Sequence, residues 1–455
     1  MDSMSRIPPE LWLEMLSLLP RDILGDVSLT SRTFHRVIRP VLFARLELHT
    51  YTAPGEFDRY LERLDFWCSD DISPLVRSCS ISPSSDHSAG PPALVFSKTR
   101  VAAFFERLPC FTALQRFSAE GVDFTLTAMA VLCRLPALDH LEIEGCRVAR
   151  EVHSPRALHI SRFSTPGIAP PSEVWIRLFH PDHLRELQLV LPDLGLVDTL
   201  PSFPHVHKLT TSWWGGMNRI LEFLAKFPAI EVLTLQHYGL EVEGADTQAY
   251  DLFPLLREYT GRSDTLPVFL PLPSLTSLTV YSCSPRDLIV QLEGIRTPNQ
   301  IISLTVSFYV FDPDREAFDH TTLSTLCGHF PELQELRISI SHGPIEDEIN
   351  SVATGFFETL AKTPLLPPSL KYLRLSWDFQ SDIEDASSPP ADKLPDFAAL
   401  RDALVARCPA LTALWLDGED FLFQWRKSLD GTVEFTADNF ESAEVRRHGR
   451  NALGF

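Results

Sequence analysis

One apolar pattern occurs twice in this chain and limits what the chain can fold into. Residues 135–146 read LPALDHLEIEGC, and residues 272–283 read LPSLTSLTVYSC. Both segments have the form Leu-Pro-x-Leu-x-x-Leu-x-aliphatic-x-x-Cys. A spaced copy of an apolar pattern indicates an internal repeat, and repeated units of this kind bury their apolar faces by stacking on their neighbours.

The central part of the pattern, aliphatic-x-x-aliphatic-x-aliphatic, recurs along most of the chain. Clear units begin at Leu138, Leu184, Ile230, Leu275, Ile301, Leu333, Leu370 and Leu411, and weaker units begin at Val76, Leu114, Leu158, Val206 and Leu256. From Leu114 onward the steps between units are 19 to 26 residues, except for the last three, which are 32, 37 and 41. A period of about 20–29 residues is typical of leucine-rich repeats, and the longer steps indicate insertions.

The spacing of the aliphatic residues has a physical cause. In the unit that begins at Leu275, Leu278 and Val280 alternate with polar neighbours, so one face of a strand is apolar and the other polar. The segments between units have helical patterns that end in proline, which cannot continue a helix. We therefore expect an α/β fold, a leucine-rich-repeat solenoid with parallel strands on its concave face and helices on its convex face. The alternative, a doubly wound sheet, lacks support because we find no Gly-rich strand-to-helix turn.

The eight cysteines are predicted to be reduced and structural. They are scattered along the chain without a Cys-x-x-Cys pair, so buried thiols are expected. Cys146 and Cys283 take the position that many leucine-rich repeats give to Asn or Cys, where a small buried group fits the turn that leaves the strand.

Residues 7–43 do not belong to the repeat. Pro9 suits the start of a helix, and Pro20 ends the first run of apolar residues at helical spacing. A second short helix follows, and a third can start at Thr30 or Ser31 and stop before Pro40. About forty residues in three helices cannot bury all of this apolar surface by themselves, so the segment is expected to need a partner.

This segment also carries a family resemblance. Its stretches IPPELWLEML, LPRDIL, VSLTSRTF and PVLF resemble an F-box, in the form that opens many fungal F-box proteins, although Thr30 and Thr33 stand where the family often has other residues. With the repeats behind it, the chain resembles the F-box plus leucine-rich-repeat architecture. We therefore expect four parts: an F-box at residues 1–48, a linker helix and Ser/Pro-rich loop at 49–93 that can include a first irregular repeat, the solenoid at 94–418, and a C-terminal cap or tail at 419–455.

The resemblance implies partners as well as a fold. In that family the F-box docks on the Skp adaptor, and through it on the cullin, of an SCF-type ubiquitin ligase, while the repeats hold a protein substrate. The residues implied for the adaptor contact, or for the helical core beneath it, are Pro8, Pro9, Leu11, Leu16, Leu19, Ile23, Leu24 and Leu29. The alternative is that residues 7–43 form an amphipathic cap on the end of the solenoid, since repeat arrays need polar-faced ends.

Charge and motif content argue against other classes of function. The 60 acidic and 40 basic residues give a formal charge of −20, which repels phosphate backbones, so no nucleic acid partner is expected. No stretch approaches the roughly 18 apolar residues that span a bilayer, and no apolar leader follows the first residues, so we expect no membrane partner and a cytoplasmic or nuclear location. No Gly-x-Ser-x-Gly, His-Glu-x-x-His or phosphate-binding loop occurs, and the 15 histidines are scattered. Neither enzymatic activity nor a metal or cofactor is therefore expected.

Substrate contacts are expected at the polar strand positions, which would form the concave face. Tyr, Trp and Arg are the residue types that anchor interfaces. The candidates are His140, Glu142, Lys208, Trp213, Trp214, Tyr281, Arg337, Tyr372, Arg374 and Trp415. For any one of them the alternative is a solvated position without a ligand, and Trp213, Trp214 and Trp377 can lie either at the rim or in the core.

These observations predict the substrate-recognition subunit of an SCF-type ubiquitin ligase, with no catalytic residues of its own. One alternative is a repeat scaffold that binds protein without any ligase, and an unrecognised enzyme is another.

Overall fold

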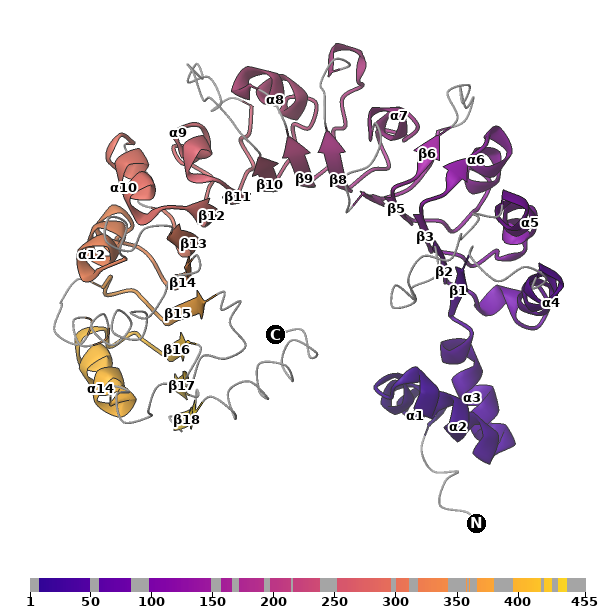
Figure 1. Ribbon diagram of the computed structural model, residues 1–455, viewed down its shortest axis with the longest axis horizontal. Helices are drawn as coiled ribbons and strands as arrows, with labels where there is room; N and C mark the ends of the chain where they lie inside the picture. The colour runs from indigo at the N-terminus through magenta and orange to yellow at the C-terminus, as the bar shows by residue number, and fades with distance from the viewer. Residues whose placement is uncertain are drawn as a thin grey trace. The chain divides into compact units, whose positions relative to one another are not determined.

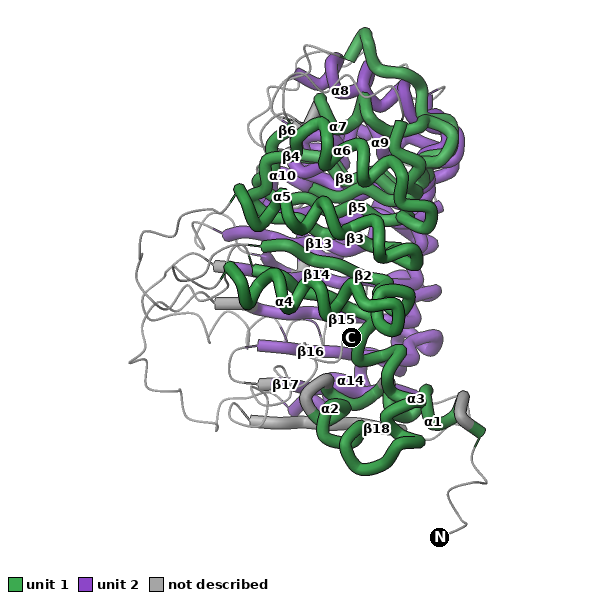
Figure 2. Tube along the Cα trace, turned by 90° about the vertical axis from the view of Figure 1, so that its right-hand side faces the viewer, with its two compact units in different colours: residues 1–212 green, residues 213–455 purple. Residues whose placement is uncertain are grey.

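The computed structural model divides the chain into two compact units, residues 1–212 and 213–455 (Figure 2). The structure describes residues 8–49, 57–82, 98–148, 157–165, 172–191, 197–213, 216–237, 252–295, 300–310, 318–342, 357, 360, 366–379, 396–418, 421–427 and 433–439.

The first unit opens with three helices, which we call the helical module: α1 (Pro9–Ser17), α2 (Arg21–Thr30) and α3 (Arg32–Leu42). The Ser31 hydroxyl accepts a hydrogen bond from the Phe34 backbone N–H at 3.1 Å, so Ser31 caps the third helix. The prediction that this helix stops before Pro40 was wrong, because it continues to Leu42 with Pro40 inside. It continues because proline removes one hydrogen bond without preventing the final turn from packing on the module.

The module has a small core of its own. Leu16, Leu24 and Ile38 are buried at its centre. Trp12 and Phe34 pack against this core and meet edge to face, with their ring centroids 5.2 Å apart. One residue from each helix therefore anchors the three-helix arrangement.

The rest of the first unit alternates strands with helices. Its remaining helices and 3-10 turns are α4 (Phe57–Trp67), η2 (Ser73–Leu75), α5 (Lys98–Arg107), η3 (Leu108–Cys110), α6 (Leu126–Leu132), α7 (Ser172–Ile176) and η4 (Val197–Thr199). Its strands are β1 (Arg45–His49), β2 (Ser78–Ser82), β3 (Arg116–Glu120), β4 (Asp123–Phe124), β5 (His140–Glu144), β6 (Arg147–Val148), β7 (Arg162–Ser164), β8 (Glu186–Leu191) and β9 (Lys208–Trp213). The sheet order is β1-β2-β3-β5-β7-β8-β9, and the strands from β1 to β8 pair in parallel, while β4 and β6 form a separate pair.

The second unit continues the alternation of strand and helix. Its helices and 3-10 turn are α8 (Met217–Leu224), η6 (Ser263–Thr265), α9 (Leu266–Phe269), α10 (Pro285–Glu293), α12 (His320–His329) and α14 (Phe397–Arg407). Its strands are β10 (Val232–His237), β11 (Glu258–Gly261), β12 (Ser277–Cys283), β13 (Ser303–Val310), β14 (Glu335–His342), β15 (Tyr372–Phe379), β16 (Ala413–Asp417), β17 (Phe421–Lys427) and β18 (Val433–Asn439). The strands from β10 to β16 pair in parallel, and β17 and β18 add an antiparallel hairpin.

In each unit the repeat helices lie on one side of the sheet (Figure 1). Strand register places equivalent repeat positions side by side, and their side chains are buried between sheet and helices. In the first unit one such row is Leu46, Cys79, Phe117, Leu141, Phe163 and Leu187. In the second unit one such row is Leu233, Tyr259, Leu278, Leu304, Leu336, Leu373 and Leu414. Burial of each large apolar side chain contributes about 1.5–3 kcal/mol. The predicted α/β fold of leucine-rich repeats with a mostly parallel sheet is therefore confirmed.

One repeat replaces the leucine with a tyrosine and compensates next to it. Tyr259 occupies the core position of β11, and its ring fills the space that the following core position would use. That position is Gly261, where a Cβ would collide with the Tyr259 ring and hydroxyl. Glycine at this site makes room for the larger ring.

All thirteen predicted repeat units contain a strand or, at Leu158, lead into one. Strand β2 corresponds to the irregular first repeat allowed within residues 49–93, while β1, β17 and β18 extend the sheet with strands that no predicted unit covers. The first strand escaped detection because its leading position is Phe43 rather than an aliphatic residue.

The turn after the repeated pattern is built alike in both copies. Gly145, with φ +60°, precedes Cys146, and Ser282, with φ +51°, precedes Cys283. The Cys146 thiol lies 3.2 Å from the Ala119 carbonyl oxygen and donates to it, while it accepts from the Val122 backbone N–H at 3.4 Å. The predicted structural role of this cysteine is confirmed, since the sulfur satisfies backbone groups at the end of the strand.

Candidate interaction surfaces

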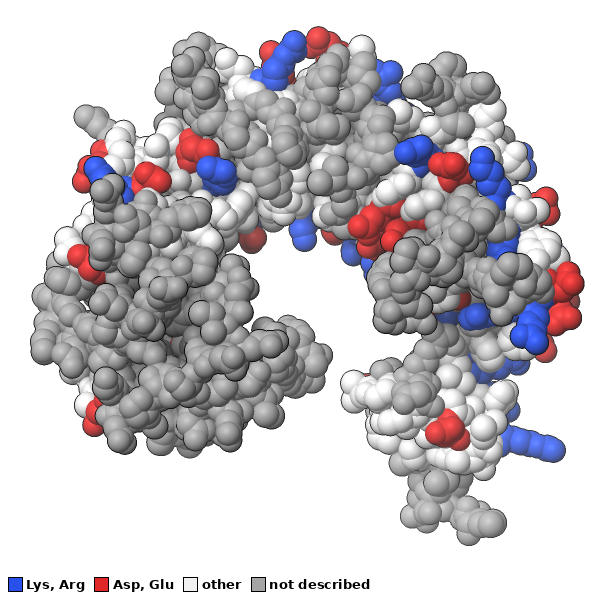
Figure 3. All heavy atoms as spheres, in the orientation of Figure 1, with Lys and Arg blue, Asp and Glu red and all other residues white. Residues whose placement is uncertain are grey.

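The helical module carries the clearest exposed apolar surface. Among the described residues, twelve large apolar side chains are exposed, and seven of them fall within α1, α2 and the turn between them: Leu11, Leu13, Met15, Leu18, Leu19, Ile23 and Leu29. Leu18 and Leu29 are the most open, at 81% and 84% exposed. The described atoms of the module are mostly uncharged in the view of Figure 3. A folded module with its own core thus leaves seven large apolar side chains exposed to water.

The predicted adaptor residues divide into two groups. Leu11, Leu19, Ile23 and Leu29 are exposed, as is Pro8. Leu16 and Leu24 are buried in the module core, so of the two roles predicted for this set, adaptor contact or the core beneath it, they have the second. Both lie on the helical face that meets α3, which their spacing alone did not separate from the opposite face. The Pro9 side chain lies outside the described part of the structure.

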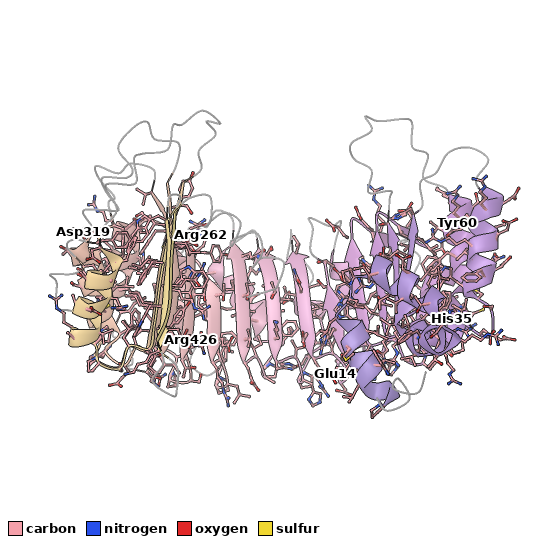
Figure 4. All side chains as sticks on the ribbon, turned by 90° about the horizontal axis from the view of Figure 1, so that it is seen from below. Glu14, His35, Tyr60, Arg262, Asp319 and Arg426 are labelled. Carbon is pink, nitrogen blue, oxygen red and sulfur yellow. The ribbon has the colours of Figure 1, made fainter. Side chains whose placement is uncertain are left out.

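The module is fixed to the first repeat of its own unit. The Arg39 guanidinium donates to the Asp71 carbonyl oxygen at 2.8 Å and lies 3.6 Å from the Asp71 carboxylate. The Phe43 ring meets the Trp67 ring of α4 edge to face, with centroids 5.5 Å apart. Figure 4 labels Glu14 and His35 on the module and Tyr60 on α4.

The sheet face opposite the helices, here called the open face, is polar in the first unit, and two of its arginines are paired with carboxylates. Arg116, His140, Arg162 and Glu186 stand side by side on successive strands. The Arg116 guanidinium donates to the Glu142 carboxylate at 2.6 Å, and the Arg162 guanidinium lies 3.3 Å from the Glu186 carboxylate. Each of these arginines therefore has a carboxylate partner on the neighbouring strand.

His140 lies between the two arginines. Its Nε2 atom is buried, and no described residue offers it a hydrogen-bond partner. Partial burial lowers the pKa of His140, and the positive charge of Arg116 lowers it further, against the opposing effect of Glu142. The imidazole is consequently held neutral more strongly than a free histidine.

Three other predicted contact residues lie in or next to β9 in the sequence, and the two described ones differ in exposure. Lys208 is exposed at the start of β9. Trp213, at the end of that strand, is only 3% exposed, so its assignment as a substrate contact was wrong: its side chain is packed in the core. Trp214 lies outside the described residues.

The open face of the second unit has a different chemistry. The Arg337 guanidinium lies over the Tyr372 ring, 5.2 Å from its centroid, and the Arg374 guanidinium lies over the Trp415 ring at 4.8 Å. These four predicted residues come together, because Arg337, Arg374 and Trp415 are register partners on β14, β15 and β16. The Tyr281 hydroxyl donates to the Leu235 carbonyl oxygen at 2.5 Å.

Trp377 is buried rather than at the rim. It follows Leu375 on the core side of β15, and its ring meets the Phe357 ring edge to face with centroids 4.9 Å apart.

The sequence places His180 and His183 close together, but it gave no sign that His159 joins them. The parallel bridge between Leu158 and Phe179 brings His159 next to His180 and His183, and the ring centroids are 4.6–5.0 Å apart. Desolvation by the adjoining rings and the charges of the two neighbouring imidazoles lower the pKa of His159. Within the described ranges, no group of three or more His, Cys, Asp or Glu side chains is placed to hold a metal ion.

The thiols are reduced, and those in the core are poor nucleophiles. None of the eight cysteines forms a disulfide; five are buried, two are partly buried and Cys110 is exposed. Burial raises the pKa of Cys146 to about 11 and of Cys283 to about 12. Among the described helices, none is both long and apolar enough to cross a membrane.

Comparisons with known proteins give structural likenesses only. No protein-family model matches the sequence, and no curated protein matches it. One similar solved structure is the TLR13–ssRNA13 complex, at 14% identity and a TM-score of 0.36, covering 76% of this chain and 40% of that one. Another is the leucine-rich repeat-containing protein LegL7 from Legionella pneumophila, at 13% identity and a TM-score of 0.36, covering 81% of this chain and 100% of that one. This chain thus spans two fifths of the length of the TLR13 chain it matches.

Proposed function

We propose that this chain is the substrate-recognition subunit of an SCF-type ubiquitin ligase. The helical module docks on a Skp adaptor, and through it on a cullin, while the open face of the repeats binds a protein substrate. The observation that carries the proposal is the apolar surface of α1 and α2, left exposed by a module that already has a core.

The distribution of apolar residues favours a docking module over a cap. A cap that only terminates a repeat array has a polar outer face. Here the outer side chains of the module include Leu11, Leu18 and Leu29, and each would gain up to about 1.5–3 kcal/mol if a partner buried it fully. The resemblance of residues 7–43 to an F-box supports the choice of a Skp adaptor as that partner.

The mechanism is presentation of the substrate. A receptor tethered to the ligase raises the local concentration of the substrate beside the loaded ubiquitin carrier, so the rate gain comes from proximity. This role asks for no catalytic side chain and no cofactor in this chain, and it belongs in the cytoplasm or the nucleus.

The test is co-purification of the full chain with a Skp adaptor. The informative variant is Leu11→Asp/Leu29→Asp, because both side chains are exposed and their replacement leaves the core of the module intact. A matched control is Leu126→Asp/Val290→Asp, which places the same charges at exposed apolar positions on α6 and α10. Circular dichroism and thermal unfolding check that all three proteins are folded.

We expect the parent and the control to retain the adaptor and the module variant to lose it. Failure of the folded parent to bind any Skp adaptor would overturn the ligase role. The chain would then be a protein-binding repeat scaffold.

A further inference from the structure

The second unit places two arginines next to each other on its open face. Arg337 on β14 and Arg374 on β15 are direct register partners, so their backbones are about 4.8 Å apart on neighbouring strands. Each guanidinium leans over a ring on the next strand, Tyr372 for Arg337 and Trp415 for Arg374. The two cations are therefore held side by side in fixed orientations.

Their hydrogen-bond donors are available. Stacking on an aromatic ring uses the flat face of a guanidinium and leaves the N–H groups at its edge free to donate. Among the described residues, none accepts a hydrogen bond from Arg337 or Arg374. The Glu335 carboxylate is 3.8 Å from the Arg337 guanidinium, and no described carboxylate lies within 4.0 Å of the Arg374 guanidinium.

The surroundings add hydroxyl donors and a further arginine, and they also contain the carboxylates of Glu335 and of Asp417, which is the register partner of Ser376. Ser339 and Ser376 stand two residues further along the same strands on the same face, and the Ser376 hydroxyl donates to the Ser339 hydroxyl at 3.3 Å. Arg426, labelled in Figure 4, is exposed on β17 at the register position of Ala413. Like charges directly opposite each other on a sheet repel, so an anion between the two arginines would relieve that cost.

We propose that the Arg337–Arg374 pair binds an acidic segment of the partner protein, through two neighbouring carboxylates or a phosphate. Planar guanidinium groups bind either kind of oxyanion with paired, charge-assisted hydrogen bonds. This inference rests on the proposed function, because it names the chemical class of the segment that the repeats present.

The experiment measures binding of short labelled peptides to the full chain by fluorescence anisotropy at about 0.15 M salt. The peptides differ only at two central residues, which are Glu-Glu, phosphoserine-Gly or Gln-Gln. The site variant is Arg337→Gln/Arg374→Gln. The matched control is Arg116→Gln/Arg162→Gln, because the Arg116 and Arg337 side chains are equally exposed, at 51%, and Arg162 is similar at 53%. Thermal unfolding confirms that both variants are folded.

We expect the site variant to lose about tenfold or more in affinity for the anionic peptides, since removing hydrogen bonds to a charged group lowers affinity by about that factor. The control is expected to change by less than about twofold, because carboxylates lie 2.6 Å and 3.3 Å from its two guanidinium groups, whereas the nearest described carboxylate is 3.8 Å from Arg337 and beyond 4.0 Å from Arg374. Tighter binding of the phosphoserine peptide would identify phosphate as the source of the oxyanion, and tighter binding of the Glu-Glu peptide would identify carboxylates. Equal affinity for the Gln-Gln peptide, equal losses in the two variants, or no binding of either anionic peptide would overturn the proposal.

The outcomes separate this inference from the ligase proposal. Adaptor co-purification without peptide binding overturns the arginine site alone. Peptide binding without adaptor co-purification overturns the ligase role and leaves the arginine site in place.

Discussion

The two units share one face and differ on the other. Toward the helices both present the same buried rows, with Leu141 in one unit and Leu278 in the other at equivalent places in the pattern. On the open face the first unit pairs Arg116 with Glu142 across neighbouring strands, whereas the second places Arg337 beside Arg374. The difference teaches that the repeat constrains only the side chains that neighbouring repeats must bury. The open face is left to vary, and recognition is expected there.

The largest expected effect tests the shared face. Leu141→Ala and Leu278→Ala should each lower the free energy of unfolding by about 2–5 kcal/mol, because each opens a cavity in a fully buried row. Urea unfolding followed by circular dichroism measures the loss. Thr279→Ala, next to Leu278 on the open face, serves as the control and should change stability by less than about 0.5 kcal/mol. A leucine variant as mild as the control would contradict the equivalence of the two rows.

The second prediction exchanges the turn residues of the two copies. Gly145→Ser should cost about 1 kcal/mol, because it puts a side chain on a backbone with positive φ. Ser282→Gly should stabilise the chain by up to about the same amount, for the same reason in reverse. A Cβ at Gly145 would meet the Gly121 backbone only at 3.8 Å, so the cost is conformational rather than steric.

Thermal and urea unfolding of both single variants decide this prediction. A change of the same sign in both would show that the two turns are not equivalent.

The third prediction compares the open faces by double-mutant cycles. Arg116 and Glu142, each changed to Gln singly and together, should show a favourable coupling of about 0.2–1 kcal/mol that shrinks in about 1 M salt. The same cycle on Arg337 and Arg374 should give a coupling of the opposite sign, since like charges face each other. A favourable coupling between the two arginines would mean that some carboxylate already joins them.

The parts of the fold that could be predicted from the sequence are those on the buried face of the sheet. The period of the leucines predicted the positions of the strands, because every repeat must bury those side chains against its neighbours. Phe43 and Tyr259 show how the pattern weakens when an aromatic residue takes an aliphatic position. The hairpin of β17 and β18 lies outside the periodic part of the chain, so the period did not predict it.

The candidate surfaces were harder to predict, since burial there depends on packing between distant segments. Helical spacing marked Leu11, Leu16 and Leu24 alike, and only the position of α3 separates the exposed first residue from the two buried ones. Likewise, Trp213 follows the polar stretch of a strand but packs inward. The contact between Arg337 and Tyr372 could be predicted only from the strand register. A long insertion lies between their repeats, so the spacing in the sequence did not give that register.

The smallest expected effect concerns pH and distinguishes the open faces once more. His140 has a lowered pKa in the folded chain because it is partly buried and faces Arg116, with Arg162 adding to the effect and Glu142 and Asp139 opposing it. The unfolded chain therefore takes up a proton at this residue more readily than the folded chain. The loss in free energy of unfolding that His140 causes is absent above about pH 7.5, and it grows as the pH falls through the ordinary histidine pKa of about 6.5.

The free energy of unfolding should consequently drop less between about pH 8 and pH 5.5 in His140→Gln than in the parent. Arg116→Gln serves as a second test, because removing the neighbouring positive charge should shrink the drop while leaving the imidazole in place. Urea unfolding at both pH values measures the difference. An identical drop in His140→Gln and the parent would show that the open face of the first unit does not respond to mild acid through this histidine.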